Sequence, residues 1–199
     1  MLFESAFSAF ARGTLIETPE GPVAVEDLHP GALLNTREGT PAKLLWVGSM
    51  TLAPSASEHG PGPVGLTRVT AGAFGLARPM CDLMAGPGAR ILRRPAGLNP
   101  RGGAEMVLTP PGDLVDGLNV VAVAPPGPLT LYHLCLRRHA VIHAAGLEVE
   151  SFHPGRGFEN GMSPRLLSQF LSMFAHAEQP ADFGPTAHPR LPLRMPDAA

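Results

Sequence analysis

Residues 9–36 read AFARGTLIETPEGPVAVEDLHPGALLNT, and this stretch decides the fold class. Two short runs rich in β-forming residues, 14–18 and 23–25, flank the turn Pro19-Glu20-Gly21. A Pro-Gly pair then precedes a third run at 32–36. Short apolar runs that are separated by Pro and Gly predict strands joined by tight turns, because these residues favour turn conformations and interrupt helices.

The same pattern continues along most of the chain. Its 199 residues include 23 Gly and 23 Pro, spread over the whole length. Further strands are predicted at residues 42–52, 64–69, 80–84, 90–93, 105–108, 119–123, 129–136, 140–144 and 147–151, with loops at 54–63 and 95–103. No helical period runs through residues 14–152. The sequence therefore predicts an all-β fold built from many short strands.

One helix is predicted near the C-terminus, at residues 164–176. Ser163 is a favourable N-cap, Pro164 suits the first helical position, and apolar residues recur behind them at helical spacing. We expect this helix to pack on the β-domain, and the alternative is a helix that binds a protein partner. From residue 179 the sequence is Pro-rich and aperiodic, which predicts a disordered tail. The expected organisation is a short leader (1–8), a β-domain (9–153), a helical segment (154–178) and the tail (179–199).

The composition points away from several classes of function. A net charge of -2 gives no indication of nucleic-acid binding. Cys81 and Cys135 are the only cysteines, too few for a metal-ligand set, and we expect both to be small buried side chains. No cofactor or metal site is predicted. No apolar run is long enough to span a bilayer, and residues 1–13 lack the basic start of a signal peptide. The sequence thus predicts a cytoplasmic protein without a membrane partner, and it is also compatible with leaderless secretion.

Four blocks of the sequence, in the same order, resemble the Hint (hedgehog/intein) self-processing domains and especially their bacterial branch. The first is the opening stretch with Gly13-Thr14 and Val25-Glu26-Asp27-Leu28, and the second is LWVG at 45–48. The third is PMCDLMAGPGARIL at 79–92, and the fourth runs from Tyr132-His133-Leu134 through His139 to Glu150-Ser151-Phe152. The resemblance covers residues 9–153 and implies a Hint-type β-fold, to which the C-terminal helix is added.

The resemblance also shows what the site lacks. In active Hint domains a cysteine attacks the peptide bond before it, and a histidine protonates the leaving nitrogen. Here Ala9 matches the cysteine, Ala89 matches the histidine, and Gly86 replaces a serine or threonine. Alanine can neither attack a carbonyl nor transfer a proton. The resemblance thus implies an intein-like domain without autocleavage, which would be a pseudoenzyme or a structural or binding module. Glu150-Ser151 stands where splicing members have His-Asn, so Asn cyclisation is not expected either.

Other residues of the matching blocks remain candidates for an active site. His139 matches a histidine of the closing block and is the best surviving candidate for a former acid or base, and the alternative is a hydrogen-bonded or exposed histidine. Asp82 matches an aspartate of the third block, where we expect it to form structural hydrogen bonds. An active self-cleaving domain would need a new nucleophile, and Ser8 and Thr14 are the nearest hydroxyls. Ser8 is one residue out of register, which turns its side chain to the other face of an extended strand. A further alternative is that Ala9 was introduced by an experimenter, although the paired changes at Ala89 and Gly86 argue against this.

Three groups of polar residues, most of them within these blocks, suggest other kinds of site. His139 and His143 are four residues apart, a spacing that suits a metal pair on a helix but not on the strand predicted here. Arg90, Arg93, Arg94 and Arg101 form one basic cluster, and Arg137-Arg138 forms another. Both are expected to be solvated surface, and the alternative is a patch for an anion or an acidic partner. A protein partner could also use the helix at 164–176 or the Pro-rich tail.

Overall fold

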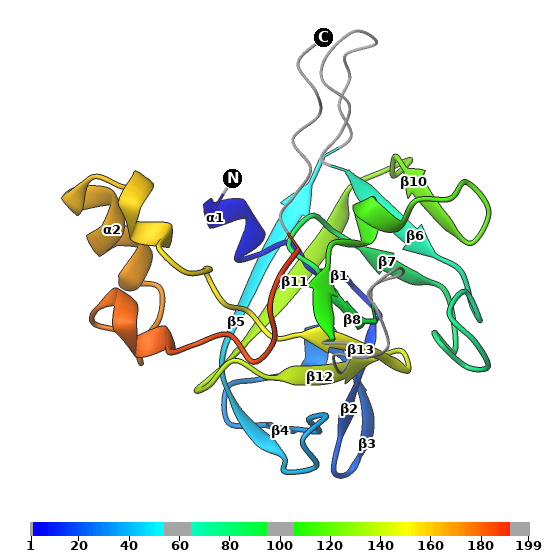
Figure 1. Ribbon diagram of the computed structural model, residues 1–199, viewed down its shortest axis with the longest axis horizontal. Helices are drawn as coiled ribbons and strands as arrows, with labels where there is room; N and C mark the ends of the chain where they lie inside the picture. The colour runs from blue at the N-terminus through cyan, green and yellow to red at the C-terminus, as the bar shows by residue number, and fades with distance from the viewer. Residues whose placement is uncertain (1, 54–64, 95–105, 192–199) are drawn as a thin grey trace, which may run out of the picture.

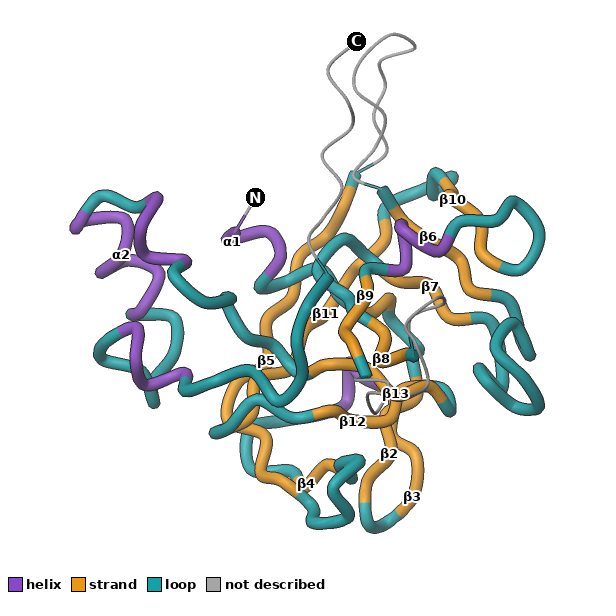
Figure 2. Tube along the Cα trace, viewed as in Figure 1, coloured by secondary structure: helices purple, strands orange, loops and turns teal. Residues whose placement is uncertain are grey.

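The computed structural model describes residues 2–53, 65–94 and 106–191, which fold mainly into short strands (Figures 1 and 2). The strands are β1 (Phe10–Ala11), β2 (Leu15–Thr18), β3 (Gly21–Ala24), β4 (Leu33–Leu34), β5 (Ala42–Leu52), β6 (Leu66–Val69), β7 (Leu83–Ala85), β8 (Ile91–Arg93), β9 (Val107–Thr109), β10 (Val120–Val123), β11 (Leu129–Leu136), β12 (Val141–Ala144) and β13 (Leu147–Glu150). The prediction of an all-β fold is confirmed.

The strands form two sheets in which neighbouring strands are antiparallel. One sheet has the order β10-β6-β7-β1-β11-β5-β4, and the other has the order β3-β2-β12-β13-β8-β9. The short strand β1 lies between β7 and β11, where Phe10 pairs with Ala85 and with Tyr132. The main core lies between the sheets and includes Phe10, Ile16, Leu134 and Ile142. The chain just before β1, which holds residues 8 and 9, is therefore enclosed by both neighbouring strands.

Most predicted strands occur, with shifts at their ends. The prediction of a strand at 80–84 is wrong for Met80, Cys81 and Asp82, because β7 begins only at Leu83. These three residues belong to the turn that follows the cis peptide bond between Arg78 and Pro79. Cys81 is consequently exposed, against our expectation, whereas Cys135 is buried as expected. The predicted loops at 54–63 and 95–103 lie outside the described residues, as do the first residues of the strands predicted at 64–69 and 105–108.

In the described residues, helical structure consists of two α-helices and a few short connections (Figure 2). Helix α1 spans Leu2–Ser5 and α2 spans Pro164–Leu171, where the Ser163 hydroxyl accepts the N–H of Leu166. Single 3-10 turns lie at Val25–Asp27, Pro111–Leu114, Phe158–Gly161 and Pro180–Phe183. Helix α2 is shorter than the predicted 164–176, because the next N–H groups bond three residues back, as in a 3-10 turn. Among the described residues, no helix is long and apolar enough to cross a bilayer.

A second apolar cluster joins both ends of the chain to the β-domain. It contains the buried side chains of Ala6, Cys135, Phe152, Phe170, Leu171, Phe174, Ala177 and Phe183, with Phe3, Phe7 and Trp46 packed against them. The leader expected at residues 1–8 is thus part of the packed structure from residue 3 onward. The apolar face of α2 is covered by other parts of the same chain, which include Trp46 of β5 and Cys135 of β11.

The segment 179–191 returns from α2 to the β-domain (Figure 1, orange to red). Its Phe183 is buried in the second cluster, and Arg190 forms a parallel bridge with Leu108 of β9. The prediction of disorder from residue 179 is therefore wrong for residues 179–191, while residues 192–199 lie outside the described residues. A buried aromatic ring and a buried ion pair anchor this segment, and both offset the entropy lost when a Pro-rich chain becomes ordered.

Candidate functional site

The two alanines at the matching positions lie together inside the core. Ala9 is 0% exposed and Ala89 is 1% exposed, and both belong to the main apolar cluster. The Ala9 N–H donates to the Tyr132 carbonyl over 3.0 Å, and the Ala9 carbonyl accepts the Gly86 N–H over 2.8 Å. The fold therefore brings the two predicted positions into one place, and it leaves neither of them accessible to solvent.

Two glycines allow the N-terminal segment to approach the chain that follows β7. A β-carbon at Gly86 would lie 2.2 Å from the Ser8 carbonyl oxygen, and one at Gly88 would lie 2.4 Å from the Ser5 carbonyl oxygen. Real β-carbons do not approach backbone oxygens so closely. Serine or threonine, the residues that active relatives have at position 86, cannot be placed here unless the backbone moves.

The Ser8 carbonyl is the group that the family's chemistry would attack. Its oxygen accepts the Gly88 N–H over 3.0 Å. A backbone donor at this oxygen is the type of group that stabilises a developing oxyanion. One element of the family's catalytic arrangement is thus present, although the nucleophile at residue 9 and the acid at residue 89 are not. Sequence reasoning missed this contact, for which the closely spaced glycines of Gly86-Pro87-Gly88 were the available signal.

His133 lies next to this contact. Its ring hydrogen-bonds to the backbone of Gly88 and packs against the rings of Phe10 and Phe152, with centroids 5.9 and 5.2 Å away. Burial lowers the pKa of His133 to about 3, and the nearby charges of Arg190 and Arg90 act in the same direction. The ring is therefore neutral near pH 7, and a neutral imidazole is a poor proton donor to a leaving group.

His139, the predicted acid or base, is held in a buried ion network. Its Nε2 lies 3.2 Å from Oε2 of Glu150, and its Nδ1 accepts the N–H of Ala187 over 2.8 Å. Glu150 also accepts a hydrogen bond from Nη1 of Arg90 over 2.8 Å and one from Nε of Arg190 over 3.0 Å. Both ring nitrogens of His139 are thus occupied, and its side chain is 0% exposed. In this position its two ring nitrogens bond to Glu150 and Ala187 and not to the Ser8 carbonyl.

Burial would by itself raise the pKa of Glu150. The hydrogen bond from His139 and the positive charges of Arg190 and Arg90 outweigh burial and lower this pKa to about 2. The carboxylate is therefore charged near neutral pH inside the protein, and it is neutralised by partners from three separate parts of the sequence. A buried charge of this kind depends on its partners, because an unpaired one would be expensive.

The other two predicted site residues support loops. Thr14 is buried, and its hydroxyl donates to the Ala11 carbonyl over 2.7 Å. Asp82 is exposed and accepts the Ala71 N–H over 2.8 Å together with the guanidinium of Arg68. The bond from Ala71, followed by that from Arg68, lowers the pKa of Asp82. Within the described part of the chain, neither side chain bonds to residue 9 or 89.

Acid is expected to destabilise the protein through its buried histidines. Burial holds the pKa of His133 at about 3 and that of His153 at about 4, both below the 6.5 of an unfolded histidine. Their contribution to stability is complete above pH 6.5 and is lost as the pH falls toward these values. Between pH 7 and 5 each would remove roughly 2 kcal/mol of unfolding free energy. Urea unfolding at both pH values measures this. His133→Gln should reduce the difference by about half, and His29→Gln, at an exposed position, should leave it unchanged.

The geometry also bears on metal binding. Across residues 2–53, 65–94 and 106–191, no group of three or more His, Cys, Asp or Glu side chains is placed to hold a metal ion. His139 and His143 do not form a pair, because His139 lies in the ion network and His143 lies on β12 opposite Glu148.

The two sheets and their arrangement around residues 8–9 are those of an all-β Hint fold, the fold of inteins. The family model of the Hint domain matches residues 8–156, and the chain belongs to this family. Solved structures with similar folds include the gp41-1 intein (14% identity, 73% of this chain, 98% of that chain, TM-score 0.43) and the MchDnaB-1 intein (15%, 72%, 100%, 0.43). A bacterial intein-like domain from Clostridium thermocellum is also similar (12%, 73%, 99%, 0.43). No curated protein matches the chain in sequence.

Proposed function

We propose that this chain is a Hint-domain protein that has lost autocleavage and serves as a structural or binding module. The observation that carries the proposal is the contact between Gly86 and the Ser8 carbonyl, which leaves no space for the side chain of an active relative. Ala9 and Ala89 fill the remaining volume as part of the apolar core. The site is therefore packed for stability around the positions where the family performs its chemistry.

Catalysis by the family mechanism would need three changes at once. It would need a thiol at residue 9, an imidazole at residue 89 and a hydroxyl at residue 86, each of which lowers a part of the barrier. The two histidines nearest to the site do not replace them. His133 is neutral and buried, and His139 has both ring nitrogens engaged.

The purified chain is expected to remain intact with dithiothreitol and with hydroxylamine. Dithiothreitol cleaves a thioester and hydroxylamine cleaves both a thioester and an ester, so intact-mass spectrometry over time measures any acyl shift at the site. An active intein such as the gp41-1 intein serves as the positive control. A species that has lost its first seven or eight residues would overturn the proposal.

The second candidate function is self-cleavage by a different nucleophile. Ser8 favours it, because its side chain is 0% exposed and its Oγ has no hydrogen-bond partner in the described structure. In this reaction Oγ would attack the Phe7 carbonyl carbon, the C–N bond would break, and the Ser8 nitrogen would take up a proton to become an amine. Water would then hydrolyse the ester. Cleavage that Ser8→Ala abolishes and Thr14→Ala preserves would establish it, and cleavage that neither variant changes would exclude it.

A further inference from the structure

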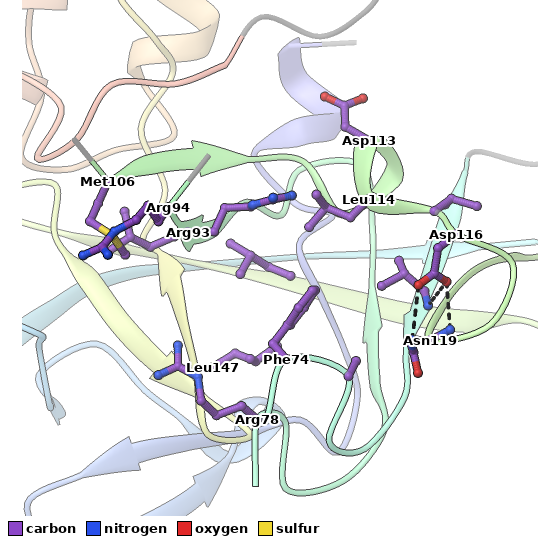
Figure 3. Close-up of a pocket in the computed structure, with 15 residues that line it drawn as sticks. Phe74, Arg78, Arg93, Arg94, Met106, Asp113, Leu114, Asp116, Asn119 and Leu147 are labelled. Atoms are coloured by element: carbon purple, nitrogen blue, oxygen red, sulfur yellow. Dashed lines mark hydrogen bonds between the residues drawn. The ribbon is translucent and has the colours of Figure 1, made fainter. Parts of the chain in front are cut away.

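A cavity on the side of the molecule away from α2 has no place in the family's chemistry (Figure 3). Its volume is about 680 Å³, which falls within the range of small-molecule sites. The end of β8, the loop between β6 and β7, and the 3-10 turn Pro111–Leu114 with the residues after it surround this cavity. Residues 8, 9 and 89 do not line it, so ligand binding here is independent of whether the chain can cleave itself.

The cavity is lined partly by apolar side chains and partly by charged ones. Its apolar part is formed by Phe74, Ile91, Leu114, Val120 and Leu147. Phe74 is 39% exposed even though it is a large aromatic side chain, and Val115, another lining residue, is 44% exposed. Exposed apolar side chains that border a cavity are typical of a surface that a ligand covers.

Three arginines add positive charge to one part of this lining. Figure 3 shows Arg93 and Arg94 on the side of β8, with Arg78 below them next to Leu147. Arg93 and Arg94 form no ion pair with any residue in the described ranges. Nη2 of Arg78 lies 3.3 Å from Oε2 of Glu148, and Oε1 of the same carboxylate lies 2.8 Å from Nε of Arg37. One carboxylate is thus shared between two arginines. Among the described residues, Arg93 and Arg94 therefore carry positive charge at this cavity without an ion-pair partner.

The two acidic residues of the lining lie on the opposite side, near Leu114 (Figure 3). Oδ1 of Asp116 accepts the N–H groups of Leu118, Asn119 and Val120, each over 2.8 Å. These bonds lower the pKa of Asp116 to about 2. The charged carboxylate is therefore hydrogen-bonded within its own loop. Asp113 is exposed. Neither acid forms an ion pair with Arg93 or Arg94 in the described structure, so both guanidinium groups remain available to a ligand.

We propose that this cavity binds an amphipathic anion, a small molecule with an apolar chain and one carboxylate or phosphate group. Its anionic group would lie between Arg93, Arg94 and Arg78, since the guanidinium fork matches the oxygens of both groups. Its apolar chain would extend over Phe74 and Leu147 toward Leu114 and cover the exposed apolar surface. A neutral apolar molecule would leave the arginine charges unpaired, and an inorganic anion would leave the apolar part exposed.

The experiment compares three probes that share one eight-carbon chain: octanoate, octyl phosphate and neutral 1-octanol. Isothermal titration calorimetry on the full chain measures their affinities at low ionic strength. We expect saturable binding of at least one anion, at least tenfold tighter than that of 1-octanol and weakened by added salt. The tighter of the two anions identifies the preferred head group, and either order supports the proposal.

Two variants test the residues that the proposal names. Arg93→Glu/Arg94→Glu should weaken binding of the anion at least tenfold, while Arg137→Glu/Arg138→Glu, with the same charge change at exposed positions on the β11–β12 turn, should not. Phe74→Ala should weaken the binding of all three probes, because this side chain is 39% exposed at the cavity. A thermal melt verifies that the variant remains folded.

Three results would overturn the proposal. The first is the absence of saturable anion binding, and the second is equal affinity for octanoate, octyl phosphate and 1-octanol. The third is anion binding that survives Arg93→Glu/Arg94→Glu in a protein whose thermal melt is unchanged. Failure of this proposal would leave the proposed loss of autocleavage untouched, because mass spectrometry measures that property separately.

Discussion

Glu150→Ala is expected to destabilise the protein by about 3–5 kcal/mol, because it removes the only carboxylate of a buried ion network. Glu150 is 1% exposed, and its two oxygens neutralise Arg90 and Arg190 and hold His139. Without it, two guanidinium groups with about one sixth of their side-chain surface exposed would face each other. The segment 184–191, which Arg190 fastens to the β-domain, is expected to detach first. Urea unfolding measures the total loss, and hydrogen exchange at residues 184–191 measures the local one.

Glu148→Ala is the matched control for this change. Glu148 lies on the same strand β13 and also pairs with two arginines, but its side chain and theirs are more exposed, at 17%, 39% and 45%. Exposed ion pairs contribute on the order of 0–1 kcal/mol, so this variant should differ little from the parent. Equal losses for the two variants would show that burial of the network does not set its contribution.

Gly86→Ala is expected to be the second severe change, although it adds a single methyl group. The new β-carbon would lie 2.2 Å from the Ser8 carbonyl oxygen and 2.8 Å from a methyl group of Leu131. A backbone oxygen cannot rotate away, so either β1 or the segment before it must move. Overpacking of this kind costs about 1–3 kcal/mol or more, and here it would also break the bond from Gly88 to Ser8. Urea unfolding again gives the magnitude.

Two comparisons identify the cause of that loss. Gly127→Ala adds the same methyl group where nothing lies within 4 Å, and it should be close to neutral. Removing residues 1–8 removes the oxygen that clashes, so Gly86→Ala should cost much less in the shortened chain than in the full one. A double-mutant cycle over these four proteins measures the coupling. Zero coupling would mean that the cost arises elsewhere, and the packed site would lose its main support.

Much of the fold could be predicted from local patterns. Strands β5 and β11 have the predicted bounds, because each is a long apolar run with clear turn residues at its ends. Strand β1 was missed, because two residues are too short for any periodic signal. The end of α2 was placed too far along the chain, since the apolar residues continue beyond Leu171 through tighter turns that have almost the same spacing.

The candidate site could be predicted only in part. The positions of Ala9 and Ala89 followed from the motif, but the partners of His139 did not, because they are distant in sequence. Arg190 lies 40 residues from Glu150, in a Pro-rich segment that has no periodic pattern. Local composition describes how a segment behaves alone, and it cannot show a single ion pair that fixes the segment to a distant strand. The contact between Gly86 and Ser8 was hidden for the same reason.

The packing of the N-terminal segment against residues 152–183 determines whether the pieces of a cleaved chain would separate. In the self-processing relatives, breaking a bond at the edge of the domain liberates the neighbouring polypeptide. Here Phe3, Ala6 and Phe7 lie in a cluster with side chains from residues 152–183, and Arg190 is fastened to Glu150. If a protease severed the chain at residue 8, the fragments would remain associated as a noncovalent complex. These contacts would hold both pieces of a cleaved chain together, and the pieces would separate only when the domain unfolds.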